Sequence, residues 1–476
     1  MAHQSELISR DIESYLKEQE NKEILRFITC GSVDDGKSTL IGRLLYDSKM
    51  IFEDQLASIK KESKKFGTTN ESMDLSLLVD GLQSERAQGI TIDVAYRLFS
   101  TDKRKFIIAD TPGHEQYTRN MATGASTADL AIILIDATKG VLTQTKRHSY
   151  IVSLFGIKTI IVAINKMDLL DFNENRFKEI QKEYENIISN LANNKSINFI
   201  YLPISALHGD NIVNRSSHTP WYKGALLMEL LNSVEFNKSN QLEDNKFRLP
   251  VQYVNRANQN FRGFAGTIAS GSVNVGDEIV VLPSYKTSKI ESIITPDIKE
   301  FSKSAYAPMA VTITLEDEID VSRGDVIVHS DSIPEVSNKL DVTVVWMDEI
   351  PMELFSSYII KRATSTVNGR FTSIVYKKDI NRFKELKADS LLVNDIAKCT
   401  LHLDSEIAID SYEENRYTGS FIVIDRYTNN TVGAGMILAV SKDEEKINSG
   451  KYSKSQKELN AYVREHFPEW ECKAIF

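Results

Sequence analysis

The stretch Gly31-Ser-Val-Asp-Asp-Gly36-Lys37-Ser38 matches the spacing GxxxxGK[ST] and directly follows an apolar run. In such a loop the backbone N–H groups surround nucleotide phosphates, the lysine reaches the β and γ oxygens, and the serine hydroxyl can bind Mg²⁺. The competing interpretation is a glycine-rich turn with an exposed lysine. We expect the phosphates to be bound by Gly31, Ser32, Val33, Asp34, Asp35, Gly36, Lys37, Ser38 and Thr39.

A second motif, Asp110-Thr111-Pro112-Gly113-His114, ends the next predicted strand and removes that alternative. The Asp110 carboxylate can hold a water on Mg²⁺, and the Gly113 N–H can bond the γ-phosphate. This last bond exists only with a triphosphate, so the segment after Gly113 can change conformation on hydrolysis. The motif therefore predicts a conformational switch.

Two residues near these motifs are predicted to take part in hydrolysis, together with Lys37. Thr91, in Gly89-Ile-Thr-Ile92, is the natural second hydroxyl ligand of Mg²⁺, although this segment by itself resembles a β-strand. The predicted metal ligands are thus Ser38, Thr91 and, through water, Asp110. His114 directly follows Gly113, so its imidazole can approach the attacking water, although a lone histidine is more often structural.

Other charged residues receive an ordinary structural interpretation. This applies to the histidines His148, His208 and His218. It also applies to three arginines near the predicted switches, which we interpret as surface or ion-pair residues: Arg86, Arg97 and Arg119. The sequence therefore identifies no arginine that would stabilise the transition state.

The motif Asn165-Lys166-Met167-Asp168 follows a later apolar run and identifies the base. The Asp168 carboxylate can accept from N1–H and from the exocyclic amine of guanine, whereas adenine offers no matching pair of donors. A backbone amide in Ser205-Ala206-Leu207 could read the guanine O6. The sequence thus predicts GTP, rather than ATP, as the ligand.

These motifs require a scaffold that brings the ends of several strands together. The runs EILRFITCG, KFIIAD, LAIILID, KTIIVAINK and NFIYLPISA alternate with helical patterns. This alternation predicts a mostly parallel sheet with helices on both faces and functional loops at the carboxyl ends of the strands. Further along the chain, short strands with frequent turn signals predict two β-barrels.

The predicted fold is therefore a multidomain α/β plus all-β protein. Its expected parts are an N-terminal helical extension (1–23), a P-loop nucleotide domain (24–236), two β-barrel domains (247–332 and 338–441) and a tail that could carry one helix (442–476). A length of 476 residues suits about three domains.

Composition narrows the class of protein. A net charge of −9 argues against a nucleic-acid partner, and the basic run Lys60–Lys65 is interpreted as a solvated helix face. The charged N-terminus and the lack of any long apolar run indicate a cytoplasmic protein without a membrane partner. The cysteines Cys30, Cys399 and Cys472 are widely spaced, which suggests incidental thiols rather than a disulfide framework or a zinc site.

The four motifs, the GITI segment and the trailing β-domains resemble the elongation factor Tu and 1-alpha superfamily over nearly the whole chain. The segments HGDNI and PWYKG, and later GDEIVVLP and RGDVI, are similar to the corresponding segments of these elongation factors. However, elongation factors typically carry His-Val-Asp-His in the phosphate loop, where this chain has Ser32-Val-Asp-Asp35.

Longer segments resemble the GTPase subunit family of bacterial sulfate adenylyltransferase: GSVDDGKSTLIGRLLYD, LVDGLQSERAQGITIDVAYRLF, RHSYIVSLFGI and NDIAKCTLHLDSEIAIDSYEENRYTGSF. The resemblance implies a heterodimer whose smaller subunit transfers adenylyl from ATP to sulfate. The present chain would hydrolyse GTP to drive formation of adenosine 5′-phosphosulfate and pyrophosphate. No second P-loop follows the last β-domain, so a separate adenylylsulfate kinase is implied.

Two other functions stay open at this point. One is an elongation-type GTPase that delivers aminoacyl-tRNA, against which the −9 charge argues. The other is a nucleotide-binding regulator or scaffold with negligible turnover, against which the presence of Asp110 and His114 argues. The partner-binding surface cannot be read from one sequence.

Overall fold

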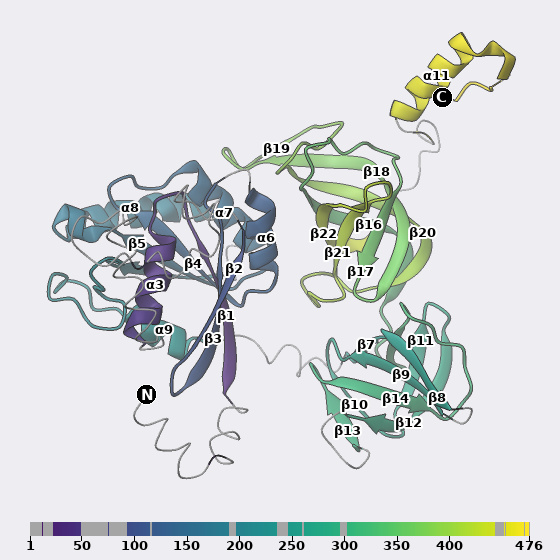
Figure 1. Ribbon diagram of the computed structural model, residues 1–476, viewed down its shortest axis with the longest axis horizontal. Helices are drawn as coiled ribbons and strands as arrows, with labels where there is room; N and C mark the ends of the chain where they lie inside the picture. The colour runs from purple at the N-terminus through teal and green to yellow at the C-terminus, as the bar shows by residue number, and fades with distance from the viewer. Residues whose placement is uncertain are drawn as a thin grey trace. The chain divides into compact units, whose positions relative to one another are not determined.

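The computed structural model describes residues 12, 22–48, 75, 93–114, 117–189, 197–235, 246–258, 261–295, 302–442, 452, 454–470 and 472–475. The chain divides into two compact units, 1–236 with 380–383, and 237–379 with 384–476 (Figure 1). Nearly all of the expected N-terminal extension lies outside the described residues, as do Thr91, Arg86 and the run Lys60–Lys65.

The first unit is built on a six-stranded sheet with the order β2-β3-β1-β4-β5-β6. Its strands are β1 (Glu23–Cys30), β2 (Ala95–Ser100), β3 (Arg104–Asp110), β4 (Leu130–Asp136), β5 (Thr159–Asn165) and β6 (Asn198–Pro203). All neighbours pair in parallel except β2, which runs antiparallel to β3 at the edge. This arrangement confirms the mostly parallel sheet.

Helices cover both faces of this sheet (Figure 1). They are α3 (Lys37–Asp47), α6 (Thr118–Ser126), α7 (Thr143–Leu154), α8 (Glu174–Ile188) and α9 (Leu227–Ser233), with a short 3₁₀ helix η3 (Met167–Leu170). On one face Phe27 of β1 shares a buried core with Leu44 of α3 and Leu231 of α9. Ile28, the next residue of β1, instead lies near Gly124 of α6. This alternation follows from side chains pointing to opposite faces along a strand.

The parallel strands place the motif loops at one edge of the sheet. Thr29 of β1 pairs with Asp110 of β3, and Asp136 of β4 pairs with Asn165 of β5. The phosphate loop follows β1, and Ser205 follows β6. Ligands of open α/β sheets bind outside the carboxyl ends of the strands, which is where all four motifs meet.

The second unit contains two antiparallel β-barrels. The first holds β7 (Arg248–Pro250), β8 (Tyr253–Asn258), β9 (Phe261–Thr267), β10 (Ser272–Asn274), β11 (Glu278–Leu282), β12 (Lys286–Ile294), β13 (Ser304–Tyr306), β14 (Ala310–Leu315) and β15 (Val326–His329). The order of its main sheet is β7-β15-β11-β12-β14-β9-β8, and the Gln252 N–H, between β7 and β8, donates to the Ala265 carbonyl of β9 at 2.8 Å.

The other barrel is closed. It holds β16 (Glu335–Trp346), β17 (Tyr358–Arg362), β18 (Ser365–Asp379), β19 (Lys384–Leu386), β20 (Ile396–Ile409), β21 (Ser420–Asp425) and β22 (Thr431–Val440). Its order is β17-β21-β22-β16-β20-β18, and β18 pairs back onto β17. The two barrels confirm the predicted fold class, whereas the individual domain boundaries stay predictions. The tail carries the expected helix, α11 (Lys454–His466), and a 3₁₀ turn, η5 (Pro468–Trp470).

A buried ion pair joins the two barrels within the second unit. Arg248 donates from Nε to Asp410 Oδ1 at 3.0 Å, and both side chains are at least nine-tenths buried. Asp410 also accepts from the Thr418 hydroxyl at 2.6 Å. A buried charge is costly unless it is paired and hydrogen-bonded, so these bonds fix how the barrels face each other.

No helix among the described residues has the length and apolarity that crossing a bilayer requires.

Candidate functional site

The phosphate loop adopts a conformation that requires glycine. Gly31 has φ +146° and Gly36 has φ +91°, and between them Asp34 has φ +69°. A Cβ on Gly31 would lie 2.8 Å from the Leu134 carbonyl, and one on Gly36 would overlap the Asn165 amide. The loop therefore packs tightly against β4 and against the third motif, which leaves no room for side chains at either glycine.

Lys37, the first residue of α3, is buried inside this loop. Its ammonium donates to the Gly31 carbonyl at 3.1 Å and to the Ser32 carbonyl at 2.8 Å. Burial lowers the pKa of Lys37, and the nearby Asp110 and Asp35 carboxylates oppose this shift. The loop thus encloses the Lys37 side chain at the place where we expect phosphate oxygens to bind.

Asp110 and Ser38 form the donor set expected for Mg²⁺. The fully buried Asp110 carboxylate accepts from the Thr29 hydroxyl at 3.0 Å and from the Ser38 hydroxyl at 3.3 Å. A carboxylate and a hydroxyl are the hard oxygen ligands that Mg²⁺ prefers, so the residues fit this ion. Thr91 lies outside the described residues, and its part in the metal site stays a prediction.

Gly113 and His114 lie beside the phosphate loop. A Cβ on Gly113 would lie 2.7 Å from both the Lys37 ammonium nitrogen and the Val33 backbone nitrogen. The Gln144 side chain donates to the Gly113 carbonyl at 3.3 Å. The next residue, His114, is exposed. The second motif thus contacts the first, while the imidazole expected to act on water is open to solvent.

Asn165 connects three of the motif loops through a single side-chain amide. Its nitrogen donates to the Asp35 carbonyl at 2.8 Å, and its oxygen accepts from the Ala206 N–H at 2.9 Å. Asn165 is itself 2% exposed. The Asn165 side chain therefore holds together the phosphate loop, the motif Asn165–Asp168 and the loop Ser205–Leu207.

The other residues of the third motif lie around a partly open carboxylate. Lys166 has φ +60°, and its ammonium lies 2.9 Å from Asp136 Oδ2. The Asp168 side chain is 16% exposed, and the His208 Nε2 lies 3.8 Å from its Oδ2. Asp168 thus remains accessible at the edge of the loop, as recognition of a base requires.

Sequence reasoning missed the role of His148 in the phosphate loop. This buried residue of α7 accepts a hydrogen bond from the Gly31 N–H through Nδ1 at 3.1 Å. Burial, together with the positive charges of Lys37 and Arg147, lowers the pKa of His148 to about 3, so the ring is neutral at physiological pH and keeps this acceptor. No spacing rule connects residues 117 positions apart, so the sequence carried no signal for the contact.

Replacing His148 by alanine is expected to weaken GDP binding about ten-fold, because the Gly31 N–H loses its acceptor at the start of the loop. His148→Gln, which keeps an acceptor oxygen, should lose less. Equilibrium titration with a fluorescent GDP analogue measures both variants. Unchanged affinity in His148→Ala would show that the contact does not support nucleotide binding.

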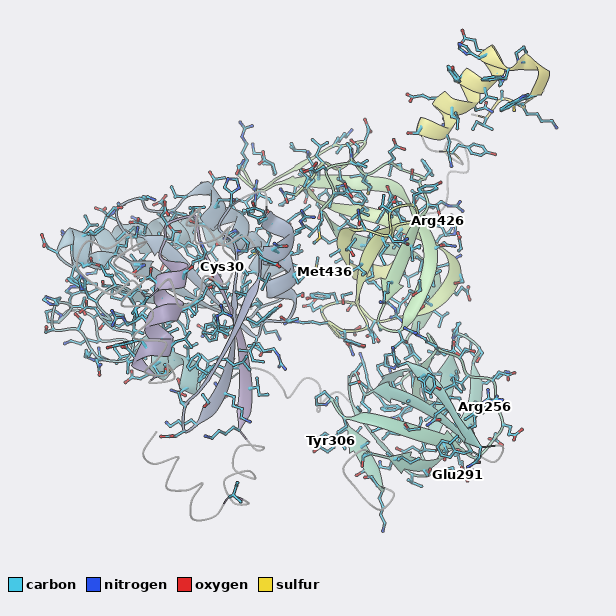
Figure 2. The ribbon with its side chains drawn as sticks, in the orientation of Figure 1. Cys30, Arg256, Glu291, Tyr306, Arg426 and Met436 are labelled. Carbon is cyan, nitrogen blue, oxygen red and sulfur yellow. The ribbon has the colours of Figure 1, made fainter. Side chains whose placement is uncertain are left out.

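Cys30 directly precedes the phosphate loop, and its thiol contacts the Thr111 side chain of the second motif. Burial raises the pKa of both the Cys30 and the Cys399 thiols to about 12, and Figure 2 shows Cys30 within the first unit.

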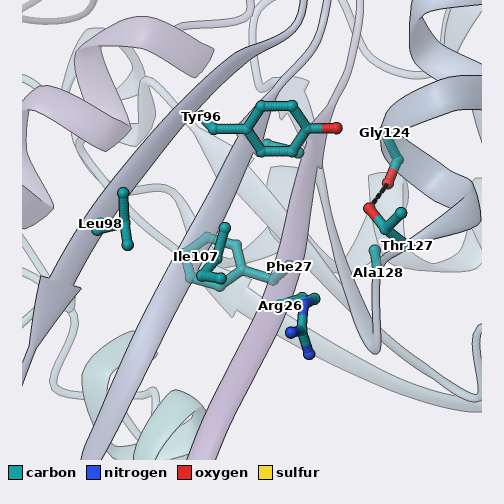
Figure 3. Close-up of a pocket in the computed structure, with 9 residues that line it drawn as sticks. Arg26, Phe27, Tyr96, Leu98, Ile107, Gly124, Thr127 and Ala128 are labelled. Carbon is teal, nitrogen blue, oxygen red and sulfur yellow. Dashed lines mark hydrogen bonds between the residues drawn. The ribbon is translucent and has the colours of Figure 1, made fainter. Parts of the chain in front are cut away.

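A pocket of about 380 Å³ opens on the first unit beside β2 (Figure 3). None of its lining residues belongs to a motif: Arg26, Phe27, Tyr96, Leu98, Ile107, Ala109, Gly124, Thr127 and Ala128.

Comparison with known proteins identifies relatives along the whole chain. Residues 22–247 match the model of the elongation factor Tu GTP binding domain, and residues 339–438 match the GTP-eEF1A C-terminal domain-like family. The solved structure of sup35 complexed with GDP covers 88% of this chain and 95% of its own, at 21% identity and a TM-score of 0.40.

Two curated relatives match at least 98% of the chain. The chain is 60% identical to the sulfate adenylyltransferase subunit 1 of Sulfurovum sp. (strain NBC37-1), with 100% of both chains covered. It is 61% identical to the sulfate adenylyltransferase subunit 1 of Aliarcobacter butzleri (strain RM4018), with 98% of both chains covered.

Proposed function

This chain belongs to the sulfate adenylyltransferase subunit 1 family, and we propose that it is the GTP-hydrolysing regulatory subunit of a sulfate adenylyltransferase. The observation that supports the proposal is about 60% identity to two relatives with that name, over at least 98% of each chain. The membership confirms the family resemblance predicted from the sequence. It does not favour the alternative of an elongation factor that delivers aminoacyl-tRNA.

The four motif loops supply the groups that a GTPase needs. In the proposed complex the phosphates of GTP lie in the loop from Gly31 to Ser38, with the Lys37 ammonium against the β and γ oxygens. Asp168 accepts from N1–H and the exocyclic amine of guanine. His114 orients the attacking water. GTP is then cleaved between the β- and γ-phosphates, and water supplies the new oxygen of inorganic phosphate.

Mg²⁺ is proposed as the cofactor of this reaction. Ser38 and Asp110 would hold it, with Thr91 as a further ligand. When bound, the ion neutralises negative charge on the β- and γ-phosphates. The fit of the Ser38 hydroxyl and the buried Asp110 carboxylate, 3.3 Å apart, supports this assignment.

The name subunit 1 implies a partner, which we propose to be a smaller subunit that carries adenylyl transfer. On that subunit, sulfate oxygen attacks the α-phosphorus of ATP, which gives adenosine 5′-phosphosulfate and pyrophosphate. Because this reaction is uphill, GTP binding and hydrolysis must change the partner's preference between substrate and product states. The segments around Thr91 and His114 are the proposed transmitters. We also propose a cytoplasmic location and a separate downstream adenylylsulfate kinase.

The test uses the complex purified with its native partner. Pyrophosphate release that depends on both ATP and sulfate is measured with GTP, without GTP, and with a non-hydrolysable GTP analogue. We expect product to accumulate well beyond the GTP-free equilibrium only with hydrolysable GTP. Equal yields in all three conditions would overturn the coupling. Retention of aminoacyl-tRNA in a GTP-dependent way would instead support the elongation function, and absence of GTP hydrolysis would support a scaffold.

A further inference from the structure

Arg43 connects the phosphate-binding helix to the loop expected to read the base. It lies on α3, six residues after Lys37, which corresponds to about 9 Å along the helix axis. Its Nε donates to the Ala206 carbonyl at 3.3 Å, and its Nη2 donates to the Leu207 carbonyl. The side chain is 18% exposed. A planar guanidinium with several fixed donors suits two neighbouring carbonyls.

The backbone N–H groups of this loop are almost all engaged within the protein. Ser205 donates to the Asp210 carbonyl, Ala206 to the Asn165 side chain, and both His208 and Gly209 to Ser205. In the part of the chain that the structure describes, the Leu207 N–H makes no hydrogen bond. It is therefore the amide of this loop that can still donate to a ligand.

The Arg43 contact determines the direction of this amide. The Ala206 carbonyl and the Leu207 N–H belong to the same planar trans peptide group, so they point in opposite directions. By holding the carbonyl on the side of α3, Arg43 keeps the N–H directed away from that helix. The loop adjoins the base-reading carboxylate, because the next residue, His208, lies 3.8 Å from Asp168.

We propose that Arg43 is a positioning residue for guanine recognition, which holds the peptide between Ala206 and Leu207 so that the Leu207 N–H donates to the guanine O6. This inference rests on the proposed function as a GTP-binding protein and assigns the part of base specificity that Asp168 does not supply. The nearby Asp47 carboxylate, 3.7 Å from the Arg43 guanidinium, helps to hold its orientation.

The test compares GDP with 6-thio-GDP, in which sulfur, a weak acceptor, replaces O6 while the donors facing Asp168 are kept. Dissociation constants are measured for the full-length protein and for Arg43→Met, Arg43→Lys and Lys178→Met. The last variant removes one exposed positive charge from α8 as a matched control. We expect the unaltered protein to prefer GDP about ten-fold. Arg43→Met should lose this preference, because GDP binding weakens about ten-fold and 6-thio-GDP binding stays within about two-fold.

The ratio of the two affinities separates positioning from folding. A variant that is partly unfolded loses both nucleotides by the same factor, so an equal loss in Arg43→Met would overturn the proposal. Arg43→Lys, which can reach one carbonyl, should retain part of the preference, and Lys178→Met should retain all of it. An unaltered preference in Arg43→Met would likewise overturn the proposal. Failure of the unaltered protein to bind GDP would overturn the proposed function itself.

Discussion

Replacement of His114 by alanine is expected to lower the single-turnover rate of GTP hydrolysis by about 10²- to 10⁴-fold, while GTP affinity changes by only a few-fold. The reason is the position of the residue. His114 is exposed and directly follows Gly113, whose backbone lies against Lys37 and the phosphate loop. Its imidazole can therefore act on water beside the γ-phosphate without contributing to ground-state binding. Rapid-quench measurement of phosphate release from pre-bound GTP tests the rate.

A control for this experiment is His218→Ala. His218 is an exposed histidine of the same unit whose ring stacks on Phe172 at 5.0 Å, so its loss should leave the hydrolysis rate unchanged. A rate in His114→Ala within two-fold of the unaltered protein would exclude the water-positioning role. A large loss of GTP affinity would instead assign His114 to nucleotide binding.

Asp168→Asn is expected to weaken GTP binding by about 10²-fold or more and to reverse the preference toward xanthosine triphosphate. In the proposed complex the carboxylate accepts two hydrogen bonds from guanine, and bonds to a charged group are among the stronger ones. Asparagine offers one acceptor and one donor. Its amide nitrogen would face the exocyclic amine of guanine, which is also a donor. The C2 carbonyl of xanthine can instead accept a hydrogen bond from the asparagine amide. Competition between the two triphosphates for the same protein measures the change.

The neighbouring Asp171 provides a matched control. It is exposed and has φ +49°, a conformation that asparagine tolerates, so Asp171→Asn should keep the guanine preference. If Asp168→Asn bound GTP and xanthosine triphosphate with the unaltered ratio, the base would be read elsewhere in the site.

The fold could be predicted where the pattern is local. The run LAIILID became β4, a strand buried along its whole length, because continuous apolar runs suit a sheet covered on both faces. The antiparallel edge strand β2 was not among the strands predicted from the sequence. The polar residues Thr101–Lys103 between β2 and β3 are a local signal of the antiparallel orientation. Two strands joined by so few residues must form a hairpin.

The candidate site was likewise predictable from the sequence where its residues belong to local motifs. Lys37, Asp110, Asn165 and Asp168 belong to motifs whose spacing is local, and the structure brings their loops to one edge of the sheet. His148 and Arg43 reach the same loops from 117 and 163 residues away, so only the folded chain reveals their contacts. The individual roles assigned to Thr91 and His114 stay predictions.

The Asn165 amide contacts both loops that are proposed to hold the two ends of a nucleotide. One rigid group bonds both the Asp35 carbonyl of the phosphate loop and the Ala206 N–H of the base loop. We therefore expect occupation of either loop to favour the bound arrangement of the other, as positive cooperativity between the two parts of one ligand site. Guanosine and pyrophosphate supplied separately should each bind far more weakly than GDP, since only the covalent ligand gives its second half a high effective concentration.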